Sequence, residues 1–261
     1  MTRGSLRCGA AFAHVKQHFG IRQFLLRGLK KVRIEWTWLV STFNLRTLMP
    51  LIQARPDPAA LCPHPGPLAH RGQGNSLPTE KLNSRDRRVL NLFSFNGGFS
   101  VAAGLGGARH VTSVDIAAQA IEAASSHWLD NGLAAESHRA VAADVFEFLE
   151  AAQQPKQNWD FVICDPPSFA PSESTKSTAL AAYARLAHLA AKATASCGLL
   201  ALASCSSHVD HDDFLNCNAE ALGKARRKAT LLADCGLPID HPTPLAMPEL
   251  RYLKFLLFKL D

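Results

Sequence analysis

The sequence lacks the features of several common protein classes. Its seven cysteines are scattered and form no CxxC pair, so neither a disulfide framework nor a metal site is indicated. No run reaches the ~18 apolar residues of a membrane-spanning helix, and the basic N-terminus has no long apolar segment followed by a small-residue cleavage site. A GxxxxGK[ST] motif is also missing, which excludes the usual phosphate-loop nucleotide site. We therefore expect a cytoplasmic protein with no membrane partner and no metal.

The positive charge of the chain lies in its N-terminal third. Residues 1–88 contain 15 Lys and Arg against 4 Asp and Glu, whereas residues 89–261 contain 13 against 18. A basic arm could attract RNA, because phosphate neutralisation supplies most non-specific affinity, but a solvated basic helix explains the same charge. The net charge of +6 therefore does not by itself predict RNA binding.

Composition divides the chain into three parts. Residues 1–52 interleave apolar and basic residues and predict a helical extension that cannot form a domain alone. Residues 53–87 are rich in Pro, His, Gly and Ser and predict a linker. Residues 88–261 alternate apolar runs with helical stretches. This last part predicts an α/β domain with a largely parallel sheet and one substantial core.

Seven strands are expected in residues 88–261. We place them at 89–93, 110–114, 138–141, a run ending at 164, 198–204, 229–234 and 252–259, with helices at 98–106, 116–131, 145–152, 178–194 and 210–224. The connection at 241–248 is too short for a helical crossover. The last two strands should therefore be antiparallel.

One predicted strand ends abruptly at Asp165. Residues 161–164 are all apolar, as in a parallel strand covered on both faces, and Pro166 and Pro167 cannot extend the ladder. Asp165 is therefore expected at the carboxyl edge of the sheet, where open α/β folds bind ligands. An ordinary strand-to-loop turn would use the same residues, because Asp-Pro is common turn chemistry.

The first three strand ends predict a cofactor site. Gly97 and Gly98 lack Cβ atoms, which lets a ligand lie against the backbone where a helix begins. Asp115 ends the second strand, where it can accept hydrogen bonds from both hydroxyls of a ribose, and Asp144 is placed for an adenine amino group. Each residue could instead serve an ordinary turn or helix cap. Their occurrence at successive strand ends favours the cofactor interpretation.

The segment Gly104-Leu-Gly-Gly107 resembles part of a dinucleotide fingerprint. It lies at the end of the first predicted helix instead of between a strand and a helix, so we interpret it as a helix C-cap and turn. An NAD-dependent oxidoreductase is therefore the less favoured alternative, because it would leave the Asp-Pro-Pro strand end unexplained.

Five segments in order resemble the motifs of class I S-adenosylmethionine-dependent methyltransferases. They lie at residues 91–101, 113–115, 144–146, 165–170 and 203–208. More narrowly, they are similar to bacterial 23S rRNA methyltransferases that make 5-methylcytosine, although near relatives methylate guanine. The resemblance implies a Rossmann-like, seven-stranded, mostly parallel sheet with an antiparallel last strand, preceded here by a poorly packed helical extension.

The resemblance also assigns roles to individual residues. It places S-adenosyl-L-methionine on the following: Phe93, Ser94, Asn96, Gly97, Gly98, Asp115, Ile116, Asp144, Val145 and Asp165. The RNA substrate would contact Pro166, Pro167, Ser168 and Phe169, and Asp165 would face the reacting base.

Methylation of cytosine C5 needs a nucleophile, because C5 itself reacts poorly until a thiolate adds to C6. Cys205 is the candidate, and its polar neighbours predict a partly exposed thiol whose pKa can be lowered. Alternatively it is a buried small hydrophobe, as most free cysteines are. Cys164 should point to the other side of its strand and be structural.

The N-terminal third departs from the family, whose members carry an RNA-binding PUA domain before the first motif. Residues 19–45 instead resemble the tail of an insertion-sequence transposase, and residues 62–71 resemble translated intergenic repeat sequence. We therefore expect a genomic fusion in which a mobile element replaced the N-terminal half of the methyltransferase. Two outcomes stay open: an active RNA cytosine methyltransferase, and a cofactor-binding remnant that has lost its RNA substrate.

Overall fold

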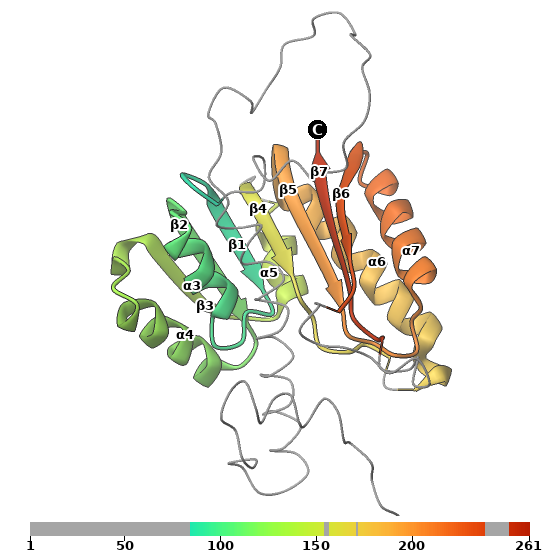
Figure 1. The fold of residues 1–261 in the computed structure, drawn as a ribbon, viewed down its shortest axis with the longest axis horizontal. Coiled ribbons are helices and arrows are strands. Elements are labelled where there is room, and N and C mark those ends of the chain that lie inside the picture. The colour runs from blue at the N-terminus through green and yellow to red at the C-terminus, as the bar shows by residue number, and fades with distance from the viewer. Residues whose placement is uncertain (1–83, 154–156, 171, 238–250) are drawn as a thin grey trace, which may run out of the picture.

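The computed structural model describes residues 84–153, 157–170, 172–237 and 251–261. These residues form a three-layer α/β unit around one seven-stranded sheet of order β3-β2-β1-β4-β5-β7-β6 (Figure 1). The predicted extension at 1–52, the linker up to residue 83 and the connection at 241–248 lie outside the described residues.

The strands agree with the sequence expectation to within a few residues. They are β1 (Arg88–Leu92), β2 (His110–Asp115), β3 (His138–Ala142), β4 (Trp159–Cys164), β5 (Thr194–Ser204), β6 (Ala229–Cys235) and β7 (Lys254–Leu260). The largest difference is at β5, which begins directly after a helix at Thr194 instead of at residue 198.

Among the residues that the structure describes, five helices and two 3-10 turns connect these strands. They are α3 (Gly98–Leu105), α4 (Ala118–Asp130), η3 (Ala135–Ser137), α5 (Val145–Ala151), η4 (Glu173–Thr175), α6 (Lys176–Ala193) and α7 (His211–Lys224). Within the described ranges, no helix combines the length and apolarity that crossing a membrane requires. Helix α3 ends at Leu105 with Gly106 as its C-cap, and Gly107 has φ +85°, which confirms the C-cap and turn interpretation of this glycine cluster.

The topology confirms a mostly parallel sheet with an antiparallel last strand. Strands β1 to β5 pair in parallel, whereas β7 pairs antiparallel with both β5 and β6. The chain therefore runs past β5 to make β6 and returns to place β7 between them. Strand β7 is almost wholly buried, as expected of a strand with a neighbour on each side.

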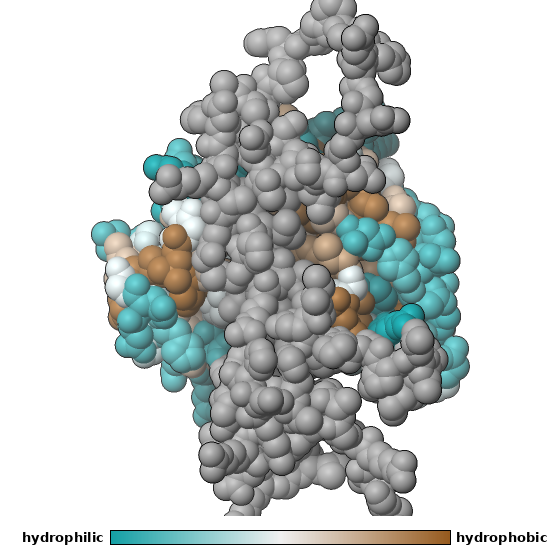
Figure 2. Space-filling view, viewed as in Figure 1, coloured by the Kyte–Doolittle hydropathy of each residue, from teal (hydrophilic) through white to brown (hydrophobic). Residues whose placement is uncertain are grey.

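Side chains that alternate along the strands build a core on each face of the sheet. On one face, Leu92, Val162 and Leu200 belong to a cluster that includes residues of α5, α6 and α7. On the other, Val111 and Phe161 belong to a cluster with residues of α3 and α4. The outward side of α7 is largely hydrophilic, consistent with a helix that buries one side only (Figure 2).

A chain of polar side chains runs beneath α3. The Asn91 amide donates to Ser100 Oγ (2.9 Å), which contacts Ser113 Oγ (2.6 Å), and Ser113 in turn contacts His138 Nε2 (2.7 Å). The His138 ring stacks on Trp128 with centroids 4.6 Å apart. Burial, together with the charge of His110, lowers the pKa of His138 to about 4. The ring is therefore neutral at neutral pH.

Candidate active site

The ends of four parallel strands lie at one edge of the sheet. Leu92 pairs with Val114 on one side and with Cys164 on the other, so the residues that follow these strands emerge at one level. The strand order reverses between β1 and β4, because β1 leads to β2 on one side and β4 leads to β5 on the other. Such a reversal point opens a crevice in which α/β proteins bind ligands.

The loop after β1 has an unusual backbone. Phe93, Phe95 and Gly97 have φ values of +57°, +45° and +82°. Non-glycine residues in this left-handed region cost about 1–3 kcal/mol each, and they cluster at functional sites because the surroundings must hold them there. The loop is therefore held in a fixed shape, which is suited to ligand binding.

Asp115 provides part of that support. Its Oδ2 accepts a hydrogen bond from the Phe95 N–H (2.8 Å) and its Oδ1 accepts one from the Ala117 N–H (2.9 Å). Each carboxylate oxygen can accept a further bond, so these contacts leave capacity for ribose hydroxyls. The neighbouring Ile116 is 74% exposed, which is unusual for a large apolar side chain and suits stacking on a flat ligand.

Close packing against helix α4 requires a glycine at position 97, a constraint that the sequence did not indicate. A Cβ atom at this position would lie 2.8 Å from Ala124 Cβ of α4, closer than real contacts allow. The space beside its Cα is therefore filled by a helix. Contact between a cofactor and the Gly97 and Gly98 backbone stays a prediction, as it does for Asn96.

Asp144 caps α5, as one of the two interpretations predicted. Its Oδ1 accepts hydrogen bonds from Phe146 N (2.8 Å) and Glu147 N (3.1 Å). Val145 is 2% exposed and packs into the core. A role for either residue in binding adenine stays a prediction, and for Val145 it would involve the backbone.

One buried hydroxyl in the β1 loop lacks a partner. Ser94 is 6% exposed, and its Oγ makes no hydrogen bond to the part of the chain that the structure describes. Buried polar groups in native proteins are nearly always paired, so this hydroxyl is available to a bound ligand. This hydroxyl and the Asp115 carboxylate fit a polar, nucleoside-containing cofactor.

The loop after β4 brings the predicted substrate residues to the same place. Pro166 is buried, Pro167 and Ser168 are exposed, and Phe169 is half-buried. The Phe169 ring meets Phe93 edge-on with centroids 6.2 Å apart, so the predicted cofactor loop and the predicted substrate loop touch. Asp165 is partly exposed at the start of this loop, at the sheet edge where it was predicted.

Hydroxyl groups join the β4 loop to the end of β5. Ser206 Oγ contacts Ser168 Oγ (2.8 Å) and Tyr183 Oη (2.9 Å), and Ser204 Oγ donates to Tyr183 Oη (3.0 Å). Ser206 and Ser204 are fully buried. They flank Cys205 in the chain, so this network fixes the backbone on both sides of the candidate nucleophile.

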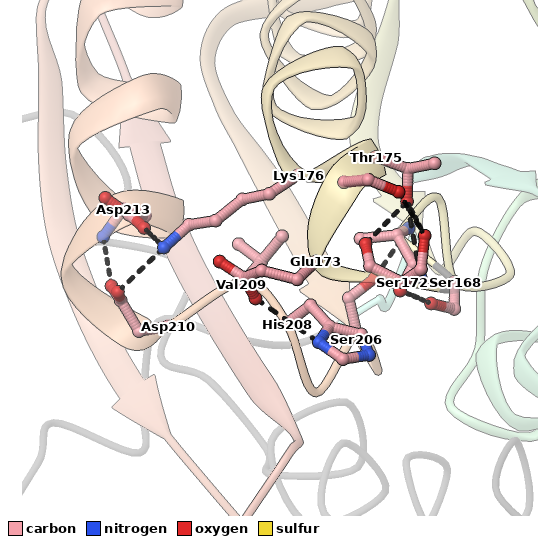
Figure 3. Close-up of polar contacts among 12 residues, drawn as sticks. Ser168, Ser172, Glu173, Thr175, Lys176, Ser206, His208, Val209, Asp210 and Asp213 are labelled. Atoms are coloured by element: carbon pink, nitrogen blue, oxygen red, sulfur yellow. Dashed lines mark hydrogen bonds and ion pairs between the residues drawn. The ribbon is translucent and has the colours of Figure 1, made fainter.

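Salt bridges reinforce the same junction from outside (Figure 3). His208 lies 3.3 Å from Glu173, and Lys176 at the start of α6 lies 3.3 Å from Asp210 and 2.5 Å from Asp213 at the start of α7. These ion pairs join the segment after β5 to η4 and the start of α6 to the start of α7.

The expected lowering of the Cys205 pKa is wrong. The thiol is half-buried, and burial, followed by the negative charge of Asp165, raises its pKa to about 11. Ser204 and Ser206 do not offset this, because they are buried and their hydroxyls bond to Tyr183. Cys164 is 1% exposed in the core, which confirms its structural role.

Sequence reasoning missed Lys254, at the start of β7. Its side chain is 4% exposed, and its charge acts to lower the pKa of Cys205, against the effect of Asp165. The available signal was a lysine in an otherwise apolar run, Leu253-Lys-Phe-Leu-Leu-Phe258. Tyr183 and Ser206 were also missed, since their contacts join residues 23 apart in the chain.

A cavity of about 480 Å³ lies elsewhere and contains none of these residues. It is lined by residues before β4 and at the start of β5, together with Arg227 and Asp261. The guanidinium of Arg227 is occupied there by the backbone carbonyls of Ala191, Thr194 and Ala195. We therefore assign the candidate active site to the strand ends, where the predicted residues converge.

Comparison with known proteins agrees with this assignment. Residues 78–221 match the model of a family described as S-adenosylmethionine-dependent methyltransferase. A ribosomal RNA large subunit methyltransferase from Deinococcus radiodurans is 39% identical over 178 residues, which is 68% of this chain and 43% of that protein. Ribosomal RNA large subunit methyltransferase I from Photobacterium profundum is 37% identical over 168 residues, or 64% of this chain and 42% of that protein.

A solved structure is similar over the same region. SMU.776, a methyltransferase crystallised in complex with SAH, is 31% identical and superimposes with a TM-score of 0.61, covering 67% of this chain and 46% of that one. The chain thus spans less than half the length of each of these three proteins.

Proposed function

The chain belongs to the S-adenosylmethionine-dependent methyltransferase family, and on that premise we propose that it methylates C5 of a cytosine in large-subunit ribosomal RNA, with Cys205 as the nucleophile. The observation that carries the proposal is the meeting of the β1 loop, the β4 loop and the Cys205 segment at the reversal point of the sheet. The printed names of the relatives support an RNA substrate, and cytosine C5 is our finer inference.

S-Adenosyl-L-methionine, when bound, supplies an electrophilic methyl group. We assign its ribose to Asp115, its adenine to the region of Ile116 and Asp144, and its amino-acid part to the β1 loop with the unpaired Ser94 hydroxyl. The fixed loop would hold the cofactor without reorganisation at the moment of reaction.

Cys205 and Asp165 would act on the base. The Cys205 thiol would pass its proton through Asp165 to cytosine N3 as Sγ bonds to C6, and the electrons of the C5–C6 double bond would make C5 electron-rich. C5 would take the methyl group as the methyl–sulfur bond of the cofactor breaks. The C5 proton would then go to water, Sγ would leave C6, and the N3 proton would return to Sγ through Asp165. Asp165 would share a proton with cytosine N3, and this neutralisation would remove one cause of the raised Cys205 pKa. The thiol would thus lose its proton more readily when a base is in place, although burial, the larger cause of its raised pKa, would remain.

The target base must leave its stack to reach this site. Phe169 offers an aromatic ring beside the β4 loop, and the exposed Pro167 and Ser168 offer surface for the flanking backbone. These residues are our candidates for RNA contact.

Labelled methyl transfer to unmodified large-subunit rRNA tests the proposal. We expect transfer by the purified full chain, loss of transfer in Cys205→Ala, and no loss in Cys217→Ala. Cys217 is a matched control, since it is also half-buried and burial raises its pKa to about 11 as well. RNA containing 5-fluorocytosine, which cannot lose a proton from C5, should trap a covalent complex with the wild type and not with Cys205→Ala.

Two results would contradict parts of the proposal. Full transfer by Cys205→Ala would remove the cysteine mechanism and favour another target atom. Calorimetric binding of S-adenosylmethionine without any transfer would favour a cofactor-binding remnant, an alternative that the raised pKa of Cys205 also supports.

A further inference from the structure

Lys254 is a buried cation whose place in the core needs an explanation. It is 4% exposed, and the five residues that follow it in β7 include four that are fully buried and apolar. Removing an ammonium group from water costs several kcal/mol unless its charge and its donors are satisfied. An apolar residue would fit this strand at a lower cost, so the local fold alone does not require a lysine.

The partners of Lys254 lie on the segment that follows β5. Lys254 pairs with Ser204 across the two strands, and its Nζ reaches forward to donate to Ser206 O (2.5 Å) and Val209 O (2.6 Å). These two carbonyls bracket residues 206–209, directly after Cys205. The ammonium thus ties β7 to the loop that carries the candidate nucleophile.

The charges around Lys254 and Cys205 oppose one another. Burial lowers the pKa of Lys254 to about 8, while Cys205 and Asp210 act to raise it. For Cys205, burial and Asp165 favour the neutral thiol, and Lys254 favours the thiolate. Tyr252 also interacts with Cys205. Burial is the larger cause that raises the pKa of the Tyr252 phenol, and the charge of Cys205 is the second. Among these groups, Lys254 is the one that supplies positive charge.

We propose that Lys254 is a positioning residue for Cys205, which holds the 205–209 segment through two carbonyls and favours the reactive thiolate through its charge. This role rests on the proposed function, in which Cys205 is the nucleophile. It assigns to β7, which lies outside every motif, a direct part in the site. Because the contact is to main-chain carbonyls, it fixes the loop whatever the loop side chains do.

Two neutral variants separate the charge from the hydrogen bonds. Lys254→Gln keeps N–H donors and loses the charge, whereas Lys254→Met loses both. Lys259→Met, on the same strand and only partly buried, is the control for removing a lysine from β7. Thermal melts of the full chain first establish that each variant folds.

The informative readout is the rate at which iodoacetamide alkylates Cys205, followed by mass spectrometry between pH 7 and 10. We expect Lys254→Gln and Lys254→Met to react about threefold to tenfold more slowly than wild type at pH 7, where the Lys254 side chain is charged, as half to one pKa unit implies. Lys259→Met should match the wild type. Methyl transfer should fall in the two Lys254 variants in kcat with little change in KM.

Unchanged alkylation in a folded Lys254→Gln protein would overturn the proposal. Loss of a cooperative melt in both neutral variants would also overturn it, because Lys254 would then serve folding alone. The alkylation assay needs neither RNA nor cofactor. If the wild-type protein transfers no methyl group but the Lys254 variants are alkylated more slowly than the wild type, the proposed function is refuted. The Lys254–Cys205 coupling then stands.

Discussion

Substitution of Gly97 by alanine should damage both stability and cofactor binding, for reasons that can be separated. The left-handed backbone at φ +82° costs an alanine about 1–2 kcal/mol. The added methyl group would also lie 2.8 Å from Ala124 Cβ and 3.1 Å from Ala124 Cα, and overpacking of this kind costs about 1–3 kcal/mol. We therefore expect Gly97→Ala to lower the free energy of unfolding by about 2–5 kcal/mol.

Gly132 provides the matched control. It has a similar left-handed backbone, φ +71°, but nothing lies within 4 Å of where its Cβ would be. Gly132→Ala should therefore lose only the backbone contribution, about 1–2 kcal/mol. The difference between the two variants isolates the contact with α4.

Urea denaturation followed by tryptophan fluorescence measures these changes, since Trp128 and Trp159 are 1% and 2% exposed and report on the core. Calorimetry should show weaker S-adenosylmethionine binding for Gly97→Ala and unchanged binding for Gly132→Ala. Adding Ala124→Gly to Gly97→Ala should recover part of the lost stability. Equal losses in the two single variants, or no recovery in the double variant, would refute the steric argument.

Two further predictions concern stability. His138 has a pKa of about 4 when folded and about 6.5 when unfolded, so the unfolded chain binds more protons between these values and stability is lost as pH falls from 6.5 towards 4. The free energy of unfolding, measured by urea denaturation, should fall by about 1–2 kcal/mol between pH 7 and pH 5. This loss should be absent in His138→Gln. Phe214 is 1% exposed, and its ring centroid lies 5.2 Å from that of Tyr183. Phe214→Ala should therefore lower the free energy of unfolding by about 3–5 kcal/mol. A smaller loss in the same titration would show that the site collapses around the missing ring.

The sheet and its ligand-binding edge could be predicted from the sequence because their signals are local. Apolar runs of strand length that alternate with helical stretches gave the order of the elements. The prolines after Asp165 marked where β4 stops, and parallel pairing then required that end to lie beside the end of β1. The glycines at 104–107 were correctly placed at a helix end because they lie at the end, and not at the start, of the helical pattern.

The rest depends on contacts between distant segments, which the sequence alone does not reveal. The pKa of Cys205 follows from burial and from Asp165, 40 residues earlier, and not from the serines beside it. The need for glycine at 97 comes from Ala124 on another helix. Lys254 finds its acceptors 45 and 48 residues upstream, so its role is visible only once β7 is seen beside β5.

The position of β7 also orders the events of synthesis. A ribosome releases β6 before β7, yet β7 is the strand with which β6 pairs in the described part of the sheet. Strands β1 to β5 can therefore assemble first as a parallel sheet. The backbone of β6 forms its hydrogen bonds to β7 only after β7 has been synthesised. Lys254 opens β7, so Cys205 is already in the nascent sheet when its positive neighbour arrives. The thiol thus gains that neighbour only after β7 has joined the sheet beside β5.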